Sequence, residues 1–446
     1  MQAAPSAPPA PTFREAATFW LKLGFISFGG PAGQIALMHQ ELVERRRWIS
    51  ERRFLHALNY CMVLPGPEAQ QLATYLGWLM HRTAGGLVAG GLFVLPSLLL
   101  LILLSTAYMA WGDVPAVAGL LWGIKPAVTA IVAVAAWRIG KRVLRNAWLW
   151  ALAVAAFLAL FALQLPFPLI VVGAGLAGAL GGRWLPQHFS AGSAHAAASA
   201  KPSPAWLDDH TPTPAHAQHA AARAWRVALV FLLLWALAIG ALSMTYGWHS
   251  VLAQMGWFFT KAALLTFGGA YAVLPYVQQH AVEQAQWLSA TQMIDGLALG
   301  ETTPGPLIMV VAFVGFVGGW SKALFGPDTL FLAGAGAACV ATFFTFLPSF
   351  AFIFLGGPFI ESTHGQLRFT APLTAITAAV VGVIVNLALY FAGHVLWPQG
   401  LQGTFDSAAA ALGLAAAVAL VRYQRSVMSV VAACAAVGLA KALLIG

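Results

Sequence analysis

Three lysines in apolar surroundings are the side chains of this sequence best suited to hold an anion. Lys22 and Lys261 each precede a Phe-Gly-Gly tripeptide by six residues, and Lys125 lies in an otherwise apolar stretch. A charged side chain at membrane depth is costly, so it usually faces a cavity or a partner of opposite charge. We therefore take all three lysines as candidate substrate ligands. The alternative, strongest for Lys22, is that the ammonium group reaches the membrane surface along its flexible stem.

Two glutamates lie beside Pro-Gly-Pro tripeptides and are candidates for carrying a coupled proton. Glu68 directly follows one tripeptide, and Glu301 precedes the other by three residues. A carboxylate is also a favourable residue in the first turn of a helix, so a purely structural role for Glu68 is an alternative. Asp295 follows a helix-start signal at Ser289, which favours a capping or interface role for it.

Glycine and proline interrupt the apolar stretches at four places. The interruptions supply the remaining candidate substrate-binding residues, which are Gly29, Gly30, Pro65, Gly66, Pro67, Gly268, Gly269, Pro304, Gly305 and Pro306. The arms beside Gly29 are about 14 residues or roughly 21 Å long, short of the roughly 30 Å hydrocarbon core. Proline suits the first turn of a helix, and helix N-termini bind anions. The pattern predicts half-helices that meet near the membrane midplane at one anion site. The alternative is that these motifs only kink or pack helices.

Composition places these motifs in a membrane protein. Of 446 residues, 60% are hydrophobic and only 8% are charged, whereas a soluble domain carries about a quarter charged residues. The sequence therefore predicts an all-α polytopic fold in a lipid bilayer. The net charge of +9 is better explained by arginine-rich cytoplasmic loops than by nucleic-acid binding.

The sequence lacks the motifs that would indicate an enzyme, a cofactor site or a metal site. A phosphate-binding glycine loop ending in Lys-Ser/Thr, an HExxH motif and a paired-cysteine motif are all missing from the sequence. The cysteines Cys61, Cys339 and Cys434 are far apart in apolar surroundings, which indicates packing and not disulfides. We expect no enzymatic activity, no cofactor and no metal site.

Long uncharged stretches locate the membrane spans. Roughly 20 apolar residues cross a bilayer, and the stretches of suitable length are Thr83–Gly112, Asn146–Gly182, Val227–Thr260, Thr329–Ile360 and Phe369–Phe405, with Ser407–Val421 and Ser426–Ala440 as a final pair. The second of these is long enough for two spans, with a turn at Leu165–Pro168.

The chain contains an internal repeat with an offset of 239 residues. The offset holds over about 50 residues and pairs Phe19 with Phe258, Lys22 with Lys261, Phe28–Gly30 with Phe267–Gly269, Trp48 with Trp287 and Pro65–Pro67 with Pro304–Pro306. Farther on, Leu95–Ser97 matches Leu347–Ser349 at an offset of 252. Internal repeats of this size are typical of secondary transporters.

Charge predicts that the two repeats have opposite orientations. The loop Glu41–Arg53 carries five arginines, but its counterpart His280–Gln292 carries no lysine or arginine. Arg138–Arg145 carries four basic residues, and its counterpart near Gly393–Gly403 carries none. Because positive residues mark the cytoplasmic side, equivalent loops lie on opposite sides. We expect an inverted-topology repeat.

The predicted organisation has four parts. Residues 1–187 form the first repeat, 188–222 a flexible linker, 223–256 a connecting transmembrane helix and 257–446 the second, inverted repeat. The linker is rich in alanine, proline and serine, and a metal-binding tail is the alternative to a tether because it also contains His188, His195, His210, His216 and His219.

The paired motifs resemble the chromate ion transporter family in its long, two-domain form. The residues that carry the resemblance are "FGGPAGQIALMHQELVERRRWISERRF", "LPGPEAQQLATYLGW", "FGGAYAVLPYVQQHAVEQAQWLS" and "GETTPGPLIMV". The resemblance covers both halves of the chain, Phe13–Ala179 and Phe258–Ala440. It implies a multi-pass inner-membrane protein that exports chromate and confers chromate resistance, coupled to proton-motive force or to exchange with sulfate.

Charge and shape alone do not separate chromate from sulfate, because both are tetrahedral dianions of similar size. The alternatives are a transporter for sulfate or another oxyanion, an anion channel of the same architecture, and a membrane scaffold that binds partners through its linker. A homodimer is a candidate assembly.

Overall fold

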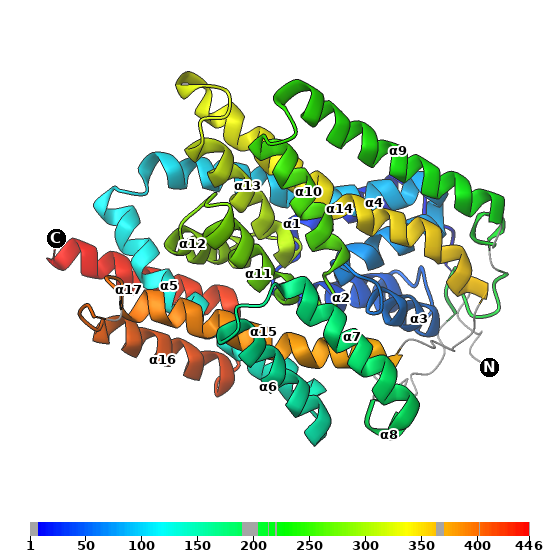
Figure 1. Cartoon of the computed structure of the whole chain (residues 1–446). Coiled ribbons are helices and arrows are strands. Elements are labelled where there is room, and N and C mark those ends of the chain that lie inside the picture. Colours follow the sequence, from blue (N-terminus) through cyan, green and yellow to red (C-terminus); the bar gives the residue numbers. More distant parts are fainter. Residues whose placement is uncertain are drawn as a thin grey trace, which may run out of the picture.

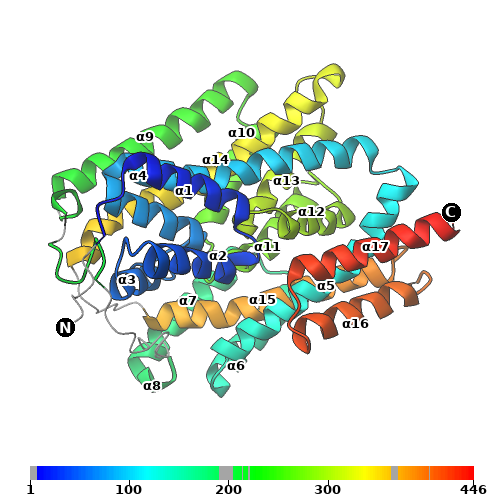
Figure 2. The same cartoon turned by 180° about the vertical axis from the view of Figure 1, so that it is seen from behind.

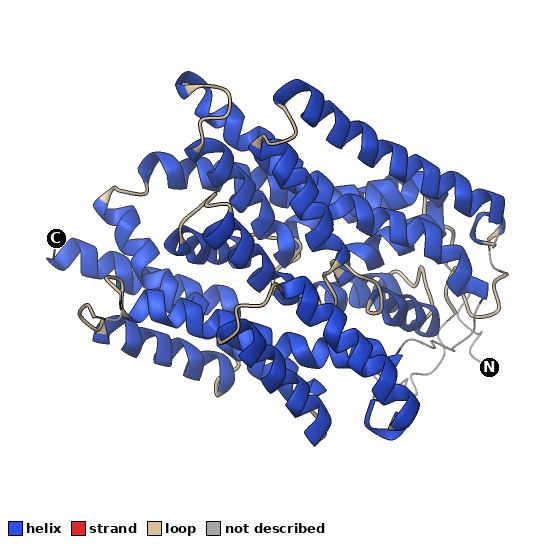
Figure 3. Cartoon of the chain, viewed as in Figure 1, coloured by secondary structure: helices blue, strands red, loops and turns tan. Residues whose placement is uncertain are grey.

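The protein is a bundle of α-helices (Figure 3). Its structure is a computed structural model that describes residues 8–189, 204–212, 214–218, 221–362, 370–400 and 402–445. The structure is 81% helical, and the part described contains no β-strand. The predicted all-α fold is therefore confirmed.

The first half of the chain forms a series of broken and continuous helices. They are α1 (Phe13–Ile26), α2 (Gly30–His39), the π-helical turn η1 (Gln40–Arg45), α3 (Glu51–Cys61), α4 (Glu68–Trp111), α5 (Pro115–Val143), α6 (Ala147–Phe161), α7 (Phe167–Trp184) and α8 (Pro186–Phe189). Within α4, non-helical backbone at His81 and Arg82 separates a buried half-helix from a long span. The predicted turn between α6 and α7 is confirmed.

The second half repeats this order after a connecting segment. The connection contains η2 (Ala215–Ala217) and α9 (Ala221–Tyr246). The repeat then follows as α10 (Val251–Leu264), α11 (Ala270–Gln278), the π-helical turn η3 (Gln279–Gln284), α12 (Ala290–Thr302), η4 (Leu307–Met309), α13 (Val310–Ser321), η5 (Pro327–Thr329), α14 (Leu330–Ser362), α15 (Thr370–Leu396), α16 (Ser407–Val421) and α17 (Val427–Ile445).

The apolar stretch Val227–Thr260 is two helices and not one. Gly247, with a φ of +89° that suits glycine, ends α9, and the side chain of Ser250 caps α10. Consequently α10 lies across the predicted boundary at residue 257. Similarly, most of Arg138–Arg145 is the last two turns of α5 and not a loop, where cations are favourable near a helix C-terminus.

Seven of the described helices are long and apolar enough to cross a membrane. They are Glu68–Trp111, Pro115–Val143, Phe167–Trp184, Ala221–Tyr246, Pro327–Pro358, Thr370–Leu396 and Val427–Leu444. Three shorter apolar helices accompany them, Ala147–Phe161, Leu307–Ser321 and Ser407–Val421. The predicted multi-pass membrane protein is confirmed at this level.

Backbone geometry repeats along with the sequence. The π-helical turns η1 and η3 are 239 residues apart. Directly after them, Arg47 and Gln286 have the unusual positive φ values of 51° and 49°. Gln164 and Gln424, both at 49°, follow α6 and α16 in the same way. A non-glycine residue with positive φ is uncommon, so these matched pairs show that equivalent sequences fold alike.

The C-terminal helices of each repeat pack against the other repeat. Helix α5 contacts α16 and α17, while its counterpart α15 contacts α6 and α7 (Figures 1 and 2). A side-chain carbon added at Gly438 of α17 would stand 2.1 Å from the Gly119 carbonyl oxygen of α5. One added at Gly178 of α7 would stand 2.5 Å from the Ala375 side chain of α15. Such reciprocal contacts are the pattern that a two-fold relation generates.

Part of the predicted linker is fixed onto the first repeat. The backbone N–H groups of Trp206 and Leu207 donate to the carbonyls of Arg47 and Trp48, each at 3.0 Å. A ring nitrogen of His216 lies 2.9 Å from the Trp78 carbonyl oxygen. Residues 190–203, 213, 219 and 220 of the linker, including His195 and His219, lie outside the described residues.

We expect the arginine-rich loop Glu41–Arg53 and its counterpart without basic residues, His280–Gln292, to face opposite sides of the membrane. Single cysteines introduced as Arg47→Cys and Gln286→Cys into a cysteine-free protein should react with an impermeant maleimide from opposite sides. These positions are matched because both residues have the same exceptional backbone conformation. Labelling from one side only would show that the repeats are parallel and not inverted.

Candidate functional site

The four helix breaks meet in two reciprocal pairs. The backbone N–H of Gly66 donates to the Thr266 carbonyl at 2.8 Å, and the N–H of Gly305 donates to the Ser27 carbonyl at 2.9 Å. Gly66 and Gly305 are equivalent in the repeat, as are Ser27 and Thr266. Each Pro-Gly-Pro motif is therefore joined to the residue that precedes Phe-Gly-Gly in the other repeat.

A serine from the other repeat also faces each Pro-Gly-Pro motif. A side-chain carbon on Gly66 would stand 2.6 Å from the Ser349 hydroxyl oxygen, and one on Gly305 would stand 2.8 Å from the Ser97 β-carbon. Both serines belong to the repeated Leu-Pro-Ser motif. Only glycine fits here, because φ is +127° at Gly66 and +111° at Gly305 and neighbouring groups leave no room.

Helix N-termini open at these junctions. Pro31 lies in the first turn of α2, Pro67 is the residue that caps α4, and Pro306 precedes η4 and α13. The first N–H groups of a helix have no partner within it, and the helix dipole makes this end positive. The predicted positions of these half-helix starts are confirmed, and their anion-binding role remains a prediction.

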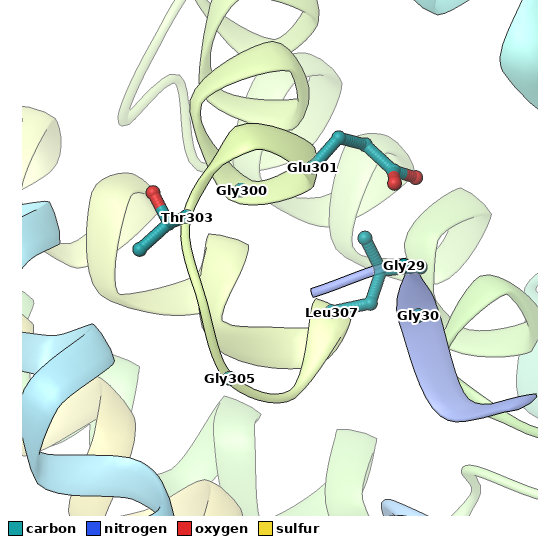
Figure 4. Close-up of a pocket in the computed structure, with 7 residues that line it drawn as sticks. All are labelled: Gly29, Gly30, Gly300, Glu301, Thr303, Gly305 and Leu307. Atoms are coloured by element: carbon teal, nitrogen blue, oxygen red, sulfur yellow. The ribbon is translucent and has the colours of Figure 1, made fainter. Parts of the chain in front are cut away.

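A small cavity lies where the second Pro-Gly-Pro motif meets the first Phe-Gly-Gly motif (Figure 4). It is lined by Gly29, Gly30, Gly300, Glu301, Thr303, Gly305 and Leu307. Its volume of about 10 Å³ leaves room for one water. A tetrahedral oxyanion is larger, so the motifs must move apart before such an ion can enter.

The two candidate coupling carboxylates lie at the two junctions. Glu301, which is 8% exposed, accepts a hydrogen bond from the Tyr271 hydroxyl at 2.5 Å, and Figure 4 shows its side chain extending toward the side where Gly29 and Leu307 lie. Glu68 is at the other junction, where its carboxylate stands 3.8 Å from the position of a side-chain carbon on Gly269. Leu307 is the repeat equivalent of Glu68, so the two junctions carry their carboxylates at positions that do not correspond in the repeat.

Buried polar atoms without a partner gather around the breaks. Among the described residues they include the hydroxyls of Ser27 and Ser349 and the amide oxygens of Gln34 and Gln71. The Gln34 amide nitrogen donates to the Gly305 carbonyl at 2.5 Å, and that of Gln71 donates to the Pro65 carbonyl at 2.8 Å. A buried polar group without a partner is costly. These hydroxyls are therefore available to a ligand that accepts hydrogen bonds.

Sequence reasoning did not single out these serines and glutamines. The repetition of Leu-Pro-Ser was the one signal that pointed to Ser97 and Ser349. Ser27 and Thr266 directly precede the repeated Phe-Gly-Gly motifs, but nothing in their spacing indicates which segment they meet.

The three candidate lysines are not brought together. Lys22 is exposed on the outer surface of α1. The Lys261 ammonium lies 5.8 Å from the centre of the Trp257 ring, which is 42% exposed. Of the three, Lys125 alone has an acidic partner among the described residues, with its ammonium 3.6 Å from a carboxylate oxygen of Asp295. All three remain predicted substrate ligands.

Asp295 is not a helix cap. The side chain of Ser289 caps α12, in a capping box with Gln292. Asp295 lies two turns farther along that helix and is 1% exposed. Of the two roles expected for Asp295, the capping role is therefore wrong, because Ser289 caps the helix, and the interface role is confirmed, because Asp295 meets Tyr108 of α4 and Lys125 of α5. The described residues contain no cluster of three His, Cys, Asp or Glu side chains that could hold a metal ion.

We expect Lys125→Ala to reduce anion transport more than Lys22→Ala or Lys261→Ala. The side chain of Lys125 is partly buried and faces a buried carboxylate, whereas Lys22 is exposed and Lys261, also partly buried, lies beside the exposed ring of Trp257. Solvent or headgroups screen a charge at an exposed position. The measurement is the KM for chromate of each variant, at equal amounts of inserted protein. A larger KM increase in Lys22→Ala would contradict this order.

Comparison with known proteins identifies the family. The family model described as "Chromate transporter" matches residues 14–179 and 253–439. The chain is 30% identical to the chromate transport protein of Cupriavidus metallidurans, over 97% of this chain and 94% of that protein. It is 35% identical to the chromate transport protein of Pseudomonas aeruginosa, over 84% and 80% of the two chains. No solved structure matches. The family model leaves out the linker and α9 but matches both repeats, which make up most of the chain. The chain therefore belongs to the chromate transporter family.

Proposed function

We propose that this chain is a secondary active transporter that exports chromate from the cytoplasm across the inner membrane and thereby confers chromate resistance. Membership of the family and the names of its relatives support chromate as the substrate. Sulfate is a second candidate substrate, because it has the same charge and shape. The chain's own residues supply the reason to expect an oxyanion at the helix breaks.

The observation that carries this proposal is the reciprocal joining of the four breaks. The bonds from Gly66 to Thr266 and from Gly305 to Ser27 bring helix starts of one repeat against the other repeat at two junctions, where the hydroxyls of Ser349 and Ser27 have no partner. A tetrahedral dianion offers acceptor oxygens in four directions. Backbone N–H groups and buried hydroxyls are the donors that can replace its hydration shell.

Alternating access follows from the same junctions. The reciprocal contacts support a two-fold relation between the repeats, and the arginine-rich loops support an axis in the membrane plane, which makes the repeats inverted. Each junction hydrogen bond contributes about 0.5–1.5 kcal/mol net. Opening one junction therefore costs little enough for substrate binding to shift the equilibrium between states. In this cycle the two junctions open in turn toward opposite sides.

Coupling is assigned to the carboxylates at the junctions. Glu301 lines the cavity and is bonded to Tyr271, and Glu68 lies beside Gly269. A proton taken up by a buried carboxylate would offset part of the repulsion between it and an approaching dianion. Either proton-motive force or exchange with sulfate can drive export in this scheme.

The test is uptake of labelled chromate into inside-out membrane vesicles. Export predicts uptake against a chromate gradient, which requires an imposed pH gradient or internal sulfate and stops when that driving force is removed. Vesicles without the protein provide the control. Uptake that never exceeds equilibrium would establish an anion channel, and uptake of sulfate without chromate would establish the other oxyanion as substrate.

A further inference from the structure

A buried carboxylate faces Lys125 from another helix. One oxygen of Asp295, on α12, lies 3.6 Å from the Lys125 ammonium of α5 and accepts a hydrogen bond at 3.0 Å from the Tyr108 hydroxyl of α4. The other four ion pairs between described residues all lie within residues 39–51. Lys125–Asp295 is thus the one described ion pair inside the apolar spans.

This pair is incompletely satisfied. The second oxygen of Asp295 is buried and has no hydrogen-bond partner among the described residues. The distance of 3.6 Å to Lys125 is longer than the 2.7–2.9 Å of a charge-assisted hydrogen bond. A pair that served only to hold α5 to α12 would gain most from close contact, because desolvation offsets much of the attraction in a buried ion pair. The observed geometry leaves the lysine able to change partner.

The two partners differ in access. The Lys125 side chain is 23% exposed and that of Asp295 only 2%. The lysine side chain is therefore only partly enclosed by the protein, whereas the aspartate is enclosed almost completely. Along α5, Lys125 lies 13 residues or roughly 20 Å from the basic turns that begin at Arg138, so it is in a different part of the membrane from them.

We propose that Asp295 is a resident counter-ion that competes with the transported oxyanion for Lys125. When the oxyanion binds, it replaces Asp295 as the partner of the lysine. When Asp295 takes the lysine back, it expels the oxyanion, so the aspartate weakens binding and speeds release. The proposal deepens the proposed function, since it rests on transport of an oxyanion. In this scheme Asp295 is a positioning residue, and Tyr108 orients it.

The competition predicts a split between KM and kcat. Asp295→Asn keeps the size of the side chain but removes the competing charge. We expect its KM for chromate to fall on the order of tenfold, with a lower kcat because release loses its driving interaction. Asp295→Glu retains the charge and should return both constants toward those of the unchanged protein. The constants are measured in proteoliposomes, per molecule of reconstituted protein.

A double variant separates competition from folding. Lys125→Ala combined with Asp295→Asn should lose the gain in affinity, because the two residues act on each other. Tyr108→Phe, which removes one hydrogen bond of Asp295 and keeps its charge, should raise KM because the carboxylate then depends on Lys125 alone. This variant tests the same point should Asp295→Asn fail to insert.

Several results would overturn the proposal. An unchanged or higher KM in Asp295→Asn shows a structural role, as does an unchanged KM in Tyr108→Phe. If the unchanged protein does not transport chromate, then the proposed function is wrong, and so is the proposed competition, which depends on it. If the unchanged protein transports chromate normally and neither Asp295→Asn nor Tyr108→Phe changes KM, then the proposed competition is wrong and the proposed function stands.

Discussion

We expect Gly66→Val and Gly305→Val, each on its own, to remove most chromate transport while the protein stays in the membrane. The reason is that both glycines have positive φ and that a side-chain carbon would collide with Ser349 or Ser97 of the other repeat. Strain of this kind costs about 1–3 kcal/mol per residue. That is enough to displace the junction, but it leaves the long spans intact. We expect efflux per inserted molecule to fall by at least about tenfold.

Two other glycines serve as controls for this experiment. Gly240 of α9 has no atom within 4 Å of an added side-chain carbon, so Gly240→Val should transport normally. Gly438→Val should instead lose folded protein, because its side chain would meet the Gly119 carbonyl oxygen in the packing of α17 against α5. Near-normal efflux per molecule in Gly66→Val and Gly305→Val would show that the Pro-Gly-Pro motifs are not the anion site.

The helices and their breaks could be predicted from the sequence because their causes are local. Proline removes a backbone donor and fixes φ, and glycine permits positive φ, so the ends of α1, α3 and α12 and the start of α4 follow from a few neighbouring residues. The repeat was equally visible, since an offset of 239 residues pairs whole motifs. These features depend on residue type and spacing, which a sequence displays directly.

The contacts across the repeats could not be predicted in this way. Equivalence by offset says that Ser27 corresponds to Thr266, but not that each bonds to the Pro-Gly-Pro motif of the other repeat. Lys125 and Asp295 are 170 residues apart and lie on helices that do not correspond. For Asp295 the sequence left a cap and an interface residue as alternatives, because helix-start signals are local and its partner is not. Packing of distant segments decides these contacts, and it leaves no periodic signal.

Glu301→Gln is expected to separate chromate movement from its driving force. The Glu301 carboxylate lines the cavity, is nearly buried and is bonded to Tyr271, so a proton on it is exchanged only when a junction opens. Glutamine keeps the shape and can still accept a hydrogen bond from the Tyr271 hydroxyl, but its amide cannot gain or lose a proton during transport. Uptake into inside-out vesicles driven by a pH gradient should fall by about tenfold or more, while downhill flux of chromate persists.

The matched control is Glu44→Gln, which changes a carboxylate whose side chain is 58% exposed outside the cavity and should leave driven uptake unchanged. Glu68→Gln tests the other junction. The repeat equivalent of Glu68 is Leu307, which lines the cavity and carries no charge. If proton coupling is confined to the cavity, Glu68→Gln keeps its response to the pH gradient and Glu301→Gln loses it. If Glu68→Gln instead loses its response to the pH gradient and Glu301→Gln keeps it, then proton coupling takes place at the first Pro-Gly-Pro motif. Driven uptake in both variants would remove the carboxylates from the mechanism and favour exchange with another anion as the force that drives export.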